Sequence, residues 1–214
     1  MIDSYKDKGA RKKLVEELKL NGINDAGVLA AIGKVPRHFF FSKTFHAHAY
    51  IDKAFPIGEG QTISQPYTVA YQTQMLQVEK NDKILEIGTG SGYQAAILIE
   101  MGANIFTIER HEKLHKSACV LLDKLNYKYT AKCGDGTKGW ASNAPFDKII
   151  VTAGAPVLPQ DLIDQLKIGG IMIIPVGNEK TQQMFSIIKK SNKDFEKIAL
   201  DSFSFVPLVG ESGW

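Results

Sequence analysis

The chain has 214 residues, 44% of them apolar, which is enough to bury one sizeable hydrophobic core without a disulfide or a structural metal. Its formal net charge of +3 comes from 26 basic and 23 acidic residues that are interspersed along the sequence. That balance indicates neither a nucleic-acid-binding protein nor a protein that binds anionic membranes, and no segment is long and apolar enough to span a bilayer.

Two helices are expected near the N-terminus, at residues 12–20 and 27–35, where apolar residues recur at helical spacing. Asn24 or Asp25 could cap the second helix. A glycine-rich loop at residues 57–62 precedes a third helix, which begins after Pro66 and ends near residue 78. We interpret residues 1–60 as an N-terminal helical subdomain packed on a core domain that comprises residues 61–214.

Short apolar runs alternate with helical stretches from Lys83 onward. The predicted strands are residues 84–87, 105–108, 127–132, 148–152 and 171–176, the predicted helices are residues 93–101, 112–125 and 159–166, and residues 185–189 and 200–206 are expected to form a final hairpin. Parallel neighbouring strands require crossover connections, which the helices supply. The pattern predicts an α/β fold with a Rossmann-like, doubly wound and mostly parallel sheet of about seven strands.

Gly88, Gly90 and Gly92 directly follow the first strand of this alternating region and open a helix. Glycines allow positive φ angles and a close approach of ligand to backbone, and open α/β sheets bind ligands at the carboxyl ends of their strands. Dinucleotide sites space their glycines G-x-G-x-x-G, whereas the spacing here is G-x-G-x-G. Glu86 would repel a pyrophosphate but could help to hold the cationic amino group of a methionine moiety, which favours S-adenosylmethionine over NAD.

Two further acidic residues follow later strands. Glu109 ends the second strand, a place from which a carboxylate can accept hydrogen bonds from both ribose hydroxyls. Asp135 lies between Gly134 and Gly136 after the third strand, where it can accept a hydrogen bond from an adenine amino group. An aspartate between glycines is also common in simple turns, but its position in register with the two upstream acids favours the binding role.

Two motifs carry a family resemblance. The segment Leu85-Glu86-Ile87-Gly88-Thr89-Gly90-Ser91-Gly92-Tyr93 resembles the cofactor motif of class I S-adenosylmethionine-dependent methyltransferases. Gly60-Gln61-Thr62-Ile63-Ser64-Gln65-Pro66-Tyr67, with Pro36-Arg37-His38-Phe39 upstream, is similar to the signature of the protein-L-isoaspartate O-methyltransferases. Similar segments at residues 134–136, 165–170, 175–177 and 205–208 extend the resemblance over nearly the whole chain.

The resemblance implies an enzyme that transfers a methyl group from S-adenosylmethionine to the free α-carboxylate of L-isoaspartyl residues in damaged proteins and peptides. The cofactor product is S-adenosylhomocysteine, and the methyl ester initiates repair through a succinimide. Ser64 is implied to be the active-site serine, near both the transferred methyl group and the substrate carboxylate, and Val206 to pair with the backbone of the bound peptide. The predicted cofactor-binding residues are Gly58, Gly60, Gln61, Thr62, Glu86, Gly88, Gly90, Ser91, Gly92, Glu109, Asp135 and Gly136.

Alternatives remain open from the residues alone. Ser64 also suits a cap for the helix that follows Pro66, and both roles are compatible. Residues 64–67 further resemble the Asp/Asn/Ser-Pro-Pro-aromatic motif of methyltransferases that act on nucleic-acid bases, so another class I methyltransferase, for a base or a small molecule, is the first alternative. Against it, Gln65 replaces the first proline and no strongly basic face is evident. The second alternative is a non-catalytic binding module with this fold, which would be expected to lack Glu86, Glu109 or the glycines. The third alternative is an NAD-dependent oxidoreductase.

The histidines and cysteines indicate no further chemistry. His46 with His48, and His111 with His115, each offer two metal ligands without a third nearby in the sequence, so no metal is expected. Cys119 and Cys133 are isolated, which suits a reducing compartment, and both are expected to be buried. Residues 1–11 lack the apolar core of a signal peptide. We expect a cytoplasmic monomer that acts on isoaspartyl proteins and peptides and binds neither nucleic acid nor membrane.

Overall fold

The computed structural model describes residues 2–214, so Met1, the first residue of the predicted subdomain, lies outside the description. The helices are α1 (Tyr5–Leu20), α2 (Ala26–Lys34), α3 (Pro66–Leu76), α4 (Tyr93–Glu100), α5 (Glu112–Lys124) and α6 (Gln160–Gln165), with short 3-10 helices η1 (Arg37–Phe40), η2 (Lys43–His48), η3 (Gly136–Lys138) and η4 (Ala141–Asn143). The strands are β1 (Phe55–Gly58), β2 (Gln61–Ile63), β3 (Lys83–Ile87), β4 (Asn104–Glu109), β5 (Thr130–Cys133), β6 (Phe146–Val151), β7 (Leu166–Gly177), β8 (Gln182–Lys189) and β9 (Phe195–Phe203).

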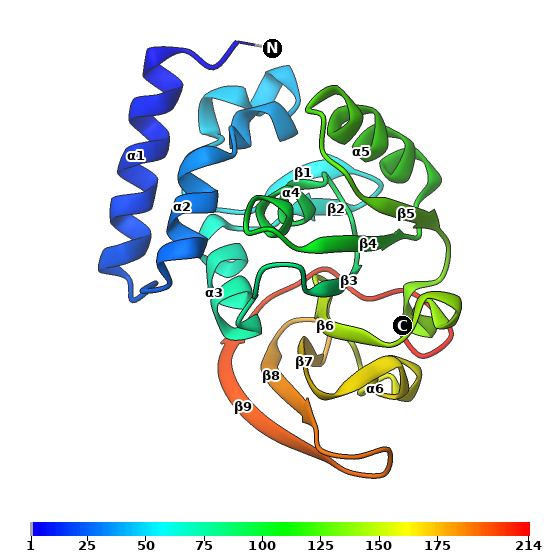
Figure 1. The fold of residues 1–214 in the computed structure, drawn as a ribbon. Helices are drawn as coiled ribbons and strands as arrows, with labels where there is room; N and C mark the ends of the chain where they lie inside the picture. Colours follow the sequence, from blue (N-terminus) through cyan, green and yellow to red (C-terminus); the bar gives the residue numbers. More distant parts are fainter. Residues whose placement is uncertain (1) are drawn as a thin grey trace.

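A seven-stranded sheet in the order β5-β4-β3-β6-β7-β8-β9 runs through the middle of the molecule (Figure 1). The strands β5, β4, β3, β6 and β7 are parallel, and β8 and β9 extend the sheet as an antiparallel hairpin. The predicted Rossmann-like, mostly parallel sheet with an N-terminal helical extension is therefore confirmed. The strand order reverses between β3 and β6, and open α/β sheets bind ligands beside such a reversal.

Local capping determines where the N-terminal helices begin. Helix α1 starts earlier than predicted because Ser4 and Asp7 form a capping box: the Ser4 hydroxyl accepts a hydrogen bond from the Asp7 N–H, and the Asp7 carboxylate accepts one from the Ser4 N–H. Helix α2 begins where expected, and its cap is Asp25 rather than Asn24, because the Asp25 carboxylate accepts a hydrogen bond from the Val28 N–H.

The segment predicted as a glycine-rich loop is a short antiparallel hairpin of β1 and β2. Its turn places Glu59 and Gly60 at positive φ angles of 52° and 70°. The predicted boundary between the two subdomains, at residue 60, falls in this turn, and the division itself stays a prediction. Helix α3 begins at Pro66 as expected and ends at Leu76, because Gln77 adopts the left-handed conformation.

Both faces of the central strands are buried, as expected for parallel strands covered by helices. On one face, Ile84 and Ile150 pack in a core that includes residues from α1 to α5. On the other face, Leu85 and Ile149 pack with residues of α6. The N-terminal helices thus share a continuous core with one face of the sheet, which fixes the segment between α2 and α3 against the strand ends.

The C-terminal segment departs from the predicted hairpin. Strand β9 ends at Phe203, and the chain then leaves the sheet edge and crosses to the loop after β6. There the Gly154 N–H donates to the Val206 carbonyl at 2.8 Å, and the Leu208 N–H donates to the Gly154 carbonyl at 2.8 Å. Residues 206–209 therefore lie beside the carboxyl ends of the central strands rather than in a strand of the hairpin.

Cys133 is exposed, which corrects the prediction that both cysteines are buried. It is the last residue of the edge strand β5, in which only Ala131 is half-buried and the other residues are exposed. Cys119 is half-buried in α5, and the two thiols form no disulfide. Within residues 2–214 no helix combines the length and the apolar character needed to cross a membrane.

Candidate active site

A cavity opens at the carboxyl ends of β3, β4 and β6, at the point where the strand order reverses. Its walls come from the last residues of β3 and β4, the loops after β3, β4 and β6, strand β2 with Ser64, and the segment that follows β9. These are residues 61–64, 87–91, 108–111, 152–153 and 206–209, with Val69, Tyr93, Gln94 and Gly136. The position is the one expected for a ligand site in a doubly wound sheet. Segments far apart in the sequence therefore converge on one hollow.

Gly88 opens the glycine loop at a φ angle of +96°, and a Cβ atom there would lie 2.5 Å from the Thr152 hydroxyl oxygen. That hydroxyl donates hydrogen bonds to the carbonyls of Ile87 and Gly88, at 3.0 and 2.7 Å. Thr152 thereby ties the end of β6 to the turn after β3. Only glycine suits this position, both in conformation and in space.

Glu109 is held at the end of β4 by two backbone donors. The Gly90 N–H donates to its Oε2 at 2.8 Å, and the His111 N–H donates to its Oε1 at 2.9 Å. The residue is only 5% exposed, yet it lines the cavity. A carboxylate has about four acceptor positions, so Glu109 retains capacity to accept hydrogen bonds from paired hydroxyl groups of a ligand.

Glu86 is not part of the cavity wall. Its side chain is completely buried, its Oε2 accepts a hydrogen bond from the Thr107 hydroxyl at 2.5 Å, and its Oε1 has no partner within the described residues. Burial raises the pKa of Glu86 to about 8, against the opposing effect of the Thr107 hydrogen bond. The predicted contact with a ligand amino group stays a prediction, since the carboxyl group lies behind the glycine loop.

Asp135 is directed toward the C-terminal segment. Its Oδ1 accepts hydrogen bonds from the N–H and hydroxyl of Thr137, and its Oδ2 accepts one from the Glu211 N–H at 2.9 Å. Burial opposes ionisation, but these donors and Arg110 hold the pKa of Asp135 below its ordinary value. The neighbouring Gly136 lines the cavity, whereas the Asp135 carboxylate does not.

Ser64 lines the cavity just after β2, and its hydroxyl has no hydrogen-bond partner within the described residues. The expected capping role is wrong, because Asp52 satisfies the start of α3 instead: its Oδ1 accepts a hydrogen bond from the Tyr67 N–H and its Oδ2 one from the Gln65 side chain, both at 2.8 Å. The hydroxyl of Ser64 is therefore available to a ligand.

Arg37 fixes the backbone of the same segment. Its guanidinium is completely buried and donates to the carbonyl of Ser64 at 2.7 Å and to that of Ala49 at 2.9 Å. Burial lowers the pKa of Arg37 to about 10, so the group stays charged at neutral pH. The sequence identified Arg37 only as part of a motif, because its contact with Ser64 joins residues that are far apart in the chain.

Val206 lies at the cavity edge with its backbone partly engaged. Its carbonyl accepts a hydrogen bond from the Gly154 N–H. Its own N–H has no acceptor within residues 2–214 and the residue is half-buried. An unpaired peptide donor at a cavity edge is the kind of group with which an extended chain can pair.

The predicted site residues divide into two groups. Those in the cavity wall are Gln61, Thr62, Ser64, Gly88, Gly90, Ser91, Glu109, Gly136 and Val206, and those outside it are Gly58, Gly60, Glu86, Gly92 and Asp135. Gly58 and Gly60 shape the hairpin turn, and Gly92 faces Leu122 of α5. Thr152, Ala153, Gln94 and His111 also line the cavity but were not predicted to be site residues. They belong to no cofactor motif, and only the order of the strands in the sheet brings them to the cavity.

Comparisons with known proteins show the family of the chain. The model of a family described as Protein-L-isoaspartate(D-aspartate) O-methyltransferase matches residues 9–213. A protein-L-isoaspartate O-methyltransferase from Cytophaga hutchinsonii is 54% identical over 214 residues, covering 100% of this chain and 97% of the relative. The relative of the same name from Flavobacterium johnsoniae is 54% identical over 210 residues, covering 98% of each chain.

Two solved structures are similar over almost the whole chain. A structure of a protein-L-isoaspartate O-methyltransferase has a TM-score of 0.86 at 29% identity and covers 95% of this chain and 67% of its own. A structure from Plasmodium falciparum, described as a complex of such an enzyme with S-adenosyl-L-homocysteine, has a TM-score of 0.82 at 26% identity and covers 93% of this chain and 98% of its own.

Proposed function

Since this chain belongs to the protein-L-isoaspartate O-methyltransferase family, we propose that its cavity holds S-adenosylmethionine beside Ser64, and that the Ser64 hydroxyl orients the carboxylate that is methylated. The enzyme uses S-adenosylmethionine and methylates L-isoaspartyl residues of damaged proteins and peptides. The assignment of individual residues to the steps of this reaction is the proposal.

The residues of the cavity fit this cofactor. Gly88 lines the cavity and has no side chain, so a ligand can approach the backbone there. Glu109 is held by two backbone donors with acceptor capacity left over, which suits paired ribose hydroxyls. We assign the adenine to the part of the wall at Gly136, whose neighbour Asp135 does not itself line the cavity, and Gln61, Thr62 and Ser91 complete the wall.

The reaction does not require acid or base catalysis by the protein. S-adenosylmethionine supplies a methyl group on a positively charged sulfur, and S-adenosylhomocysteine leaves when the new O–CH₃ bond forms and the S–CH₃ bond breaks. A carboxylate with a pKa of roughly 4 is already ionised at neutral pH, so no general base is required. The protein's residues orient the carboxylate and exclude water, and the methyl ester product closes to a succinimide more readily than the free carboxylate.

The observation that carries the proposal is the unengaged hydroxyl of Ser64 in the cavity wall. Asp52 satisfies the start of α3, and Arg37 holds the Ser64 carbonyl, so the hydroxyl is positioned without being occupied. Val206 offers a free N–H on the opposite segment, which can pair with the backbone of the substrate. Together they suit a peptide whose carboxylate enters between these two segments.

A pair of substitutions tests these roles. Ser64→Ala should reduce kcat by about 10–100-fold with the KM for S-adenosylmethionine within about twofold of wild type, because a hydrogen bond to a charged group contributes roughly 1.5–3 kcal/mol. Glu109→Gln should instead raise that KM by about tenfold or more, because the charge-assisted acceptor is lost. Steady-state kinetics with an isoaspartyl peptide separate the two effects.

Ser42→Ala is the matched control, because Ser42 is exposed and its side chain caps no helix. It should retain wild-type kinetics. Full activity of Ser64→Ala would remove Ser64 from the reaction, and an unchanged KM in Glu109→Gln would remove Glu109 from the cofactor site. Neither result would affect the family assignment.

We also propose that the enzyme acts in the cytoplasm as a monomer and engages neither nucleic acid nor membrane. The two unpaired cysteines support a reducing compartment, and the net charge of +3 supports the absence of a polyanion site. Light scattering on the purified chain checks the oligomeric state against the mass of 23.6 kDa.

A further inference from the structure

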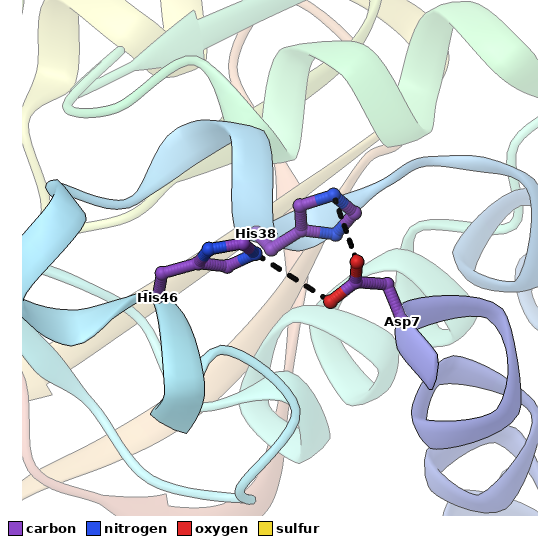
Figure 2. A group of neighbouring side chains, drawn as sticks. All are labelled: Asp7, His38 and His46. Carbon is purple, nitrogen blue, oxygen red and sulfur yellow. Dashed lines mark ion pairs between the residues drawn. The ribbon is translucent and has the colours of Figure 1, made fainter. Parts of the chain in front are cut away.

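Three potential metal ligands converge on the N-terminal side of the molecule, away from the cavity described above. Asp7 comes from the first turn of α1, His38 from η1 and His46 from η2 (Figure 2). The Nε2 atom of His46 lies 3.5 Å from Asp7 Oδ1, and the Nε2 atom of His38 lies 3.9 Å from Asp7 Oδ2. The ligand atoms all lie within 4.8 Å of one another.

These separations are too long for hydrogen bonds and close to those of a metal site. No hydrogen bond joins the three side chains to one another within the described residues, although both imidazoles direct a nitrogen toward the carboxylate (Figure 2). In a tetrahedral site with bonds of about 2.0–2.1 Å, neighbouring ligand atoms are about 3.3 Å apart. The imidazole rings of His38 and His46 are stacked with their centroids 4.8 Å apart, so both rings have to turn to bring all three ligand atoms onto one ion.

Surrounding groups hold the ligands in orientation, as the outer partners of metal ligands do. The Nδ1 atom of His38 and the Tyr50 hydroxyl are joined by a hydrogen bond of 2.7 Å, and the Tyr50 oxygen accepts a hydrogen bond from Arg11. With Nδ1 engaged in this way, Nε2 is the nitrogen that faces the carboxylate. The Ser4 hydroxyl donates to Asp7 Oδ2, which leaves Oδ1 toward His46.

The cluster is accessible from solvent. The side chains of His38 and Asp7 are 2% and 18% exposed, whereas that of His46 is 47% exposed. Asp7, His46 and Tyr50 line a cavity of about 700 Å³, through which an ion and a water ligand can reach the site. The Ile2 carbonyl oxygen lies within hydrogen-bond distance of His38 Nε2, at 3.3 Å, so this nitrogen has to leave the carbonyl and release its proton when it binds an ion.

We propose that Asp7, His38 and His46 form a binding site for a borderline transition-metal dication, with Zn²⁺ as the best fit. Two imidazoles and one carboxylate are the donor set that Zn²⁺ accepts in a tetrahedral site with a water in the fourth position. Mg²⁺ and Ca²⁺ prefer oxygen ligands only. The bound ion ties the start of α1 to η1 and η2, the segment that leads to Asp52 and so to the loop of Ser64.

Zinc binding to the tag-free chain tests this inference, measured by calorimetry with zinc sulfate and by thermal denaturation. Wild type should bind one Zn²⁺, and its Tm should rise by roughly 5–10 °C at a free zinc concentration about 100 times Kd. Magnesium at the same concentration should give no rise. His46→Ala and Asp7→Asn should each weaken zinc binding at least about tenfold and abolish most of the Tm rise.

His48→Ala is the matched control, because His48 is an exposed histidine of the same η2 segment that is not part of the cluster. It should bind zinc as wild type does. His46 is largely exposed, so its loss should leave the fold intact, and the far-ultraviolet circular dichroism spectrum verifies this. Failure of wild type to bind zinc, or zinc binding that survives both His46→Ala and Asp7→Asn or falls equally in His48→Ala, would overturn the proposal without bearing on methyl transfer.

Discussion

Glu86 lies inside the protein, with its carboxyl group beneath the glycine loop. The Thr107 hydroxyl donates to this carboxyl group and lies 2.6 Å from the Thr89 hydroxyl, so a short chain of polar groups links Glu86 to the loop that shapes the cavity. Burial raises the pKa of Glu86 to about 8, so the folded protein keeps this group protonated near neutral pH. The uncharged carboxyl group of Glu86 therefore stabilises the glycine loop through Thr107 and Thr89.

Glu86→Gln should make the stability of the protein less dependent on pH. Between pH 4.5 and pH 8 the folded chain retains a proton on Glu86 that the unfolded chain has released, so the free energy of unfolding of wild type falls as the pH rises, by at most about 1.4 kcal/mol per pH unit. Glutamine does not ionise, so the variant lacks this fall in the free energy of unfolding. Urea denaturation at several pH values should show the variant gaining on wild type from about pH 5 to pH 8.

The exposed residue Glu16 provides the control, because Glu16→Gln should follow the pH dependence of wild type. A constant difference between Glu86→Gln and wild type over this range would contradict the protonated state of Glu86. The position of Glu86 before the glycine loop was readable from the sequence. Its protonation was not, because it results from the burial of a strand residue by the helices above it.

The element that presents Ser64 is the short connection between β2 and α3, and its supports come from earlier in the chain. Arg37 of η1 holds the Ser64 carbonyl, and Asp52 holds the first turn of α3. The N-terminal helices pack on one face of the sheet and bring both residues to this place. The N-terminal part thus positions the segment that carries Ser64, which is the residue proposed to orient the substrate.

Asp52→Ala should lower kcat while the KM for S-adenosylmethionine remains close to the wild-type value, because the Ser64 segment loses its anchor but the cofactor wall does not. Loss of an acceptor at a helix start costs about 1 kcal/mol of stability, which thermal denaturation should detect. Gln65→Ala removes only one of the two hydrogen bonds of Asp52 and should give a smaller effect. Wild-type kcat in Asp52→Ala would show that the anchor is unnecessary.

The sequence predicted the boundaries of helices and strands where the residues that determine them are close together in the chain. Pro66 marked the start of α3 and Asp25 that of α2, whereas the capping box of Ser4 and Asp7 was overlooked and α1 was predicted too short. Strand β9 was misplaced, because its burial pattern alternates weakly and its outer edge is unpaired. The contacts of Arg37 and the meeting of Asp7 with two histidines depend on tertiary packing, which no local pattern contains.

At the scale of the whole molecule, the strand order explains why the site lies where it does. The order reverses between β3 and β6 (Figure 1). The loops after these strands and after β4 line the cavity, together with residues 61–64 and 206–209. The alternation of strands and helices was sufficient to predict this sheet and its glycine loop. It did not reveal that residues 206–209 return to the same cavity, because that path depends on the backbone hydrogen bonds with Gly154.

The central claim is that this cavity methylates isoaspartyl rather than ordinary aspartyl residues. The most direct measurement is transfer of labelled methyl from S-adenosylmethionine to two synthetic peptides that differ only in having isoaspartate or aspartate at one position. We predict a preference of at least roughly 100-fold for the isoaspartyl peptide, because only it offers the free α-carboxylate that the site orients. Equal transfer to both peptides, or no transfer to either with cofactor binding intact, would contradict the claim.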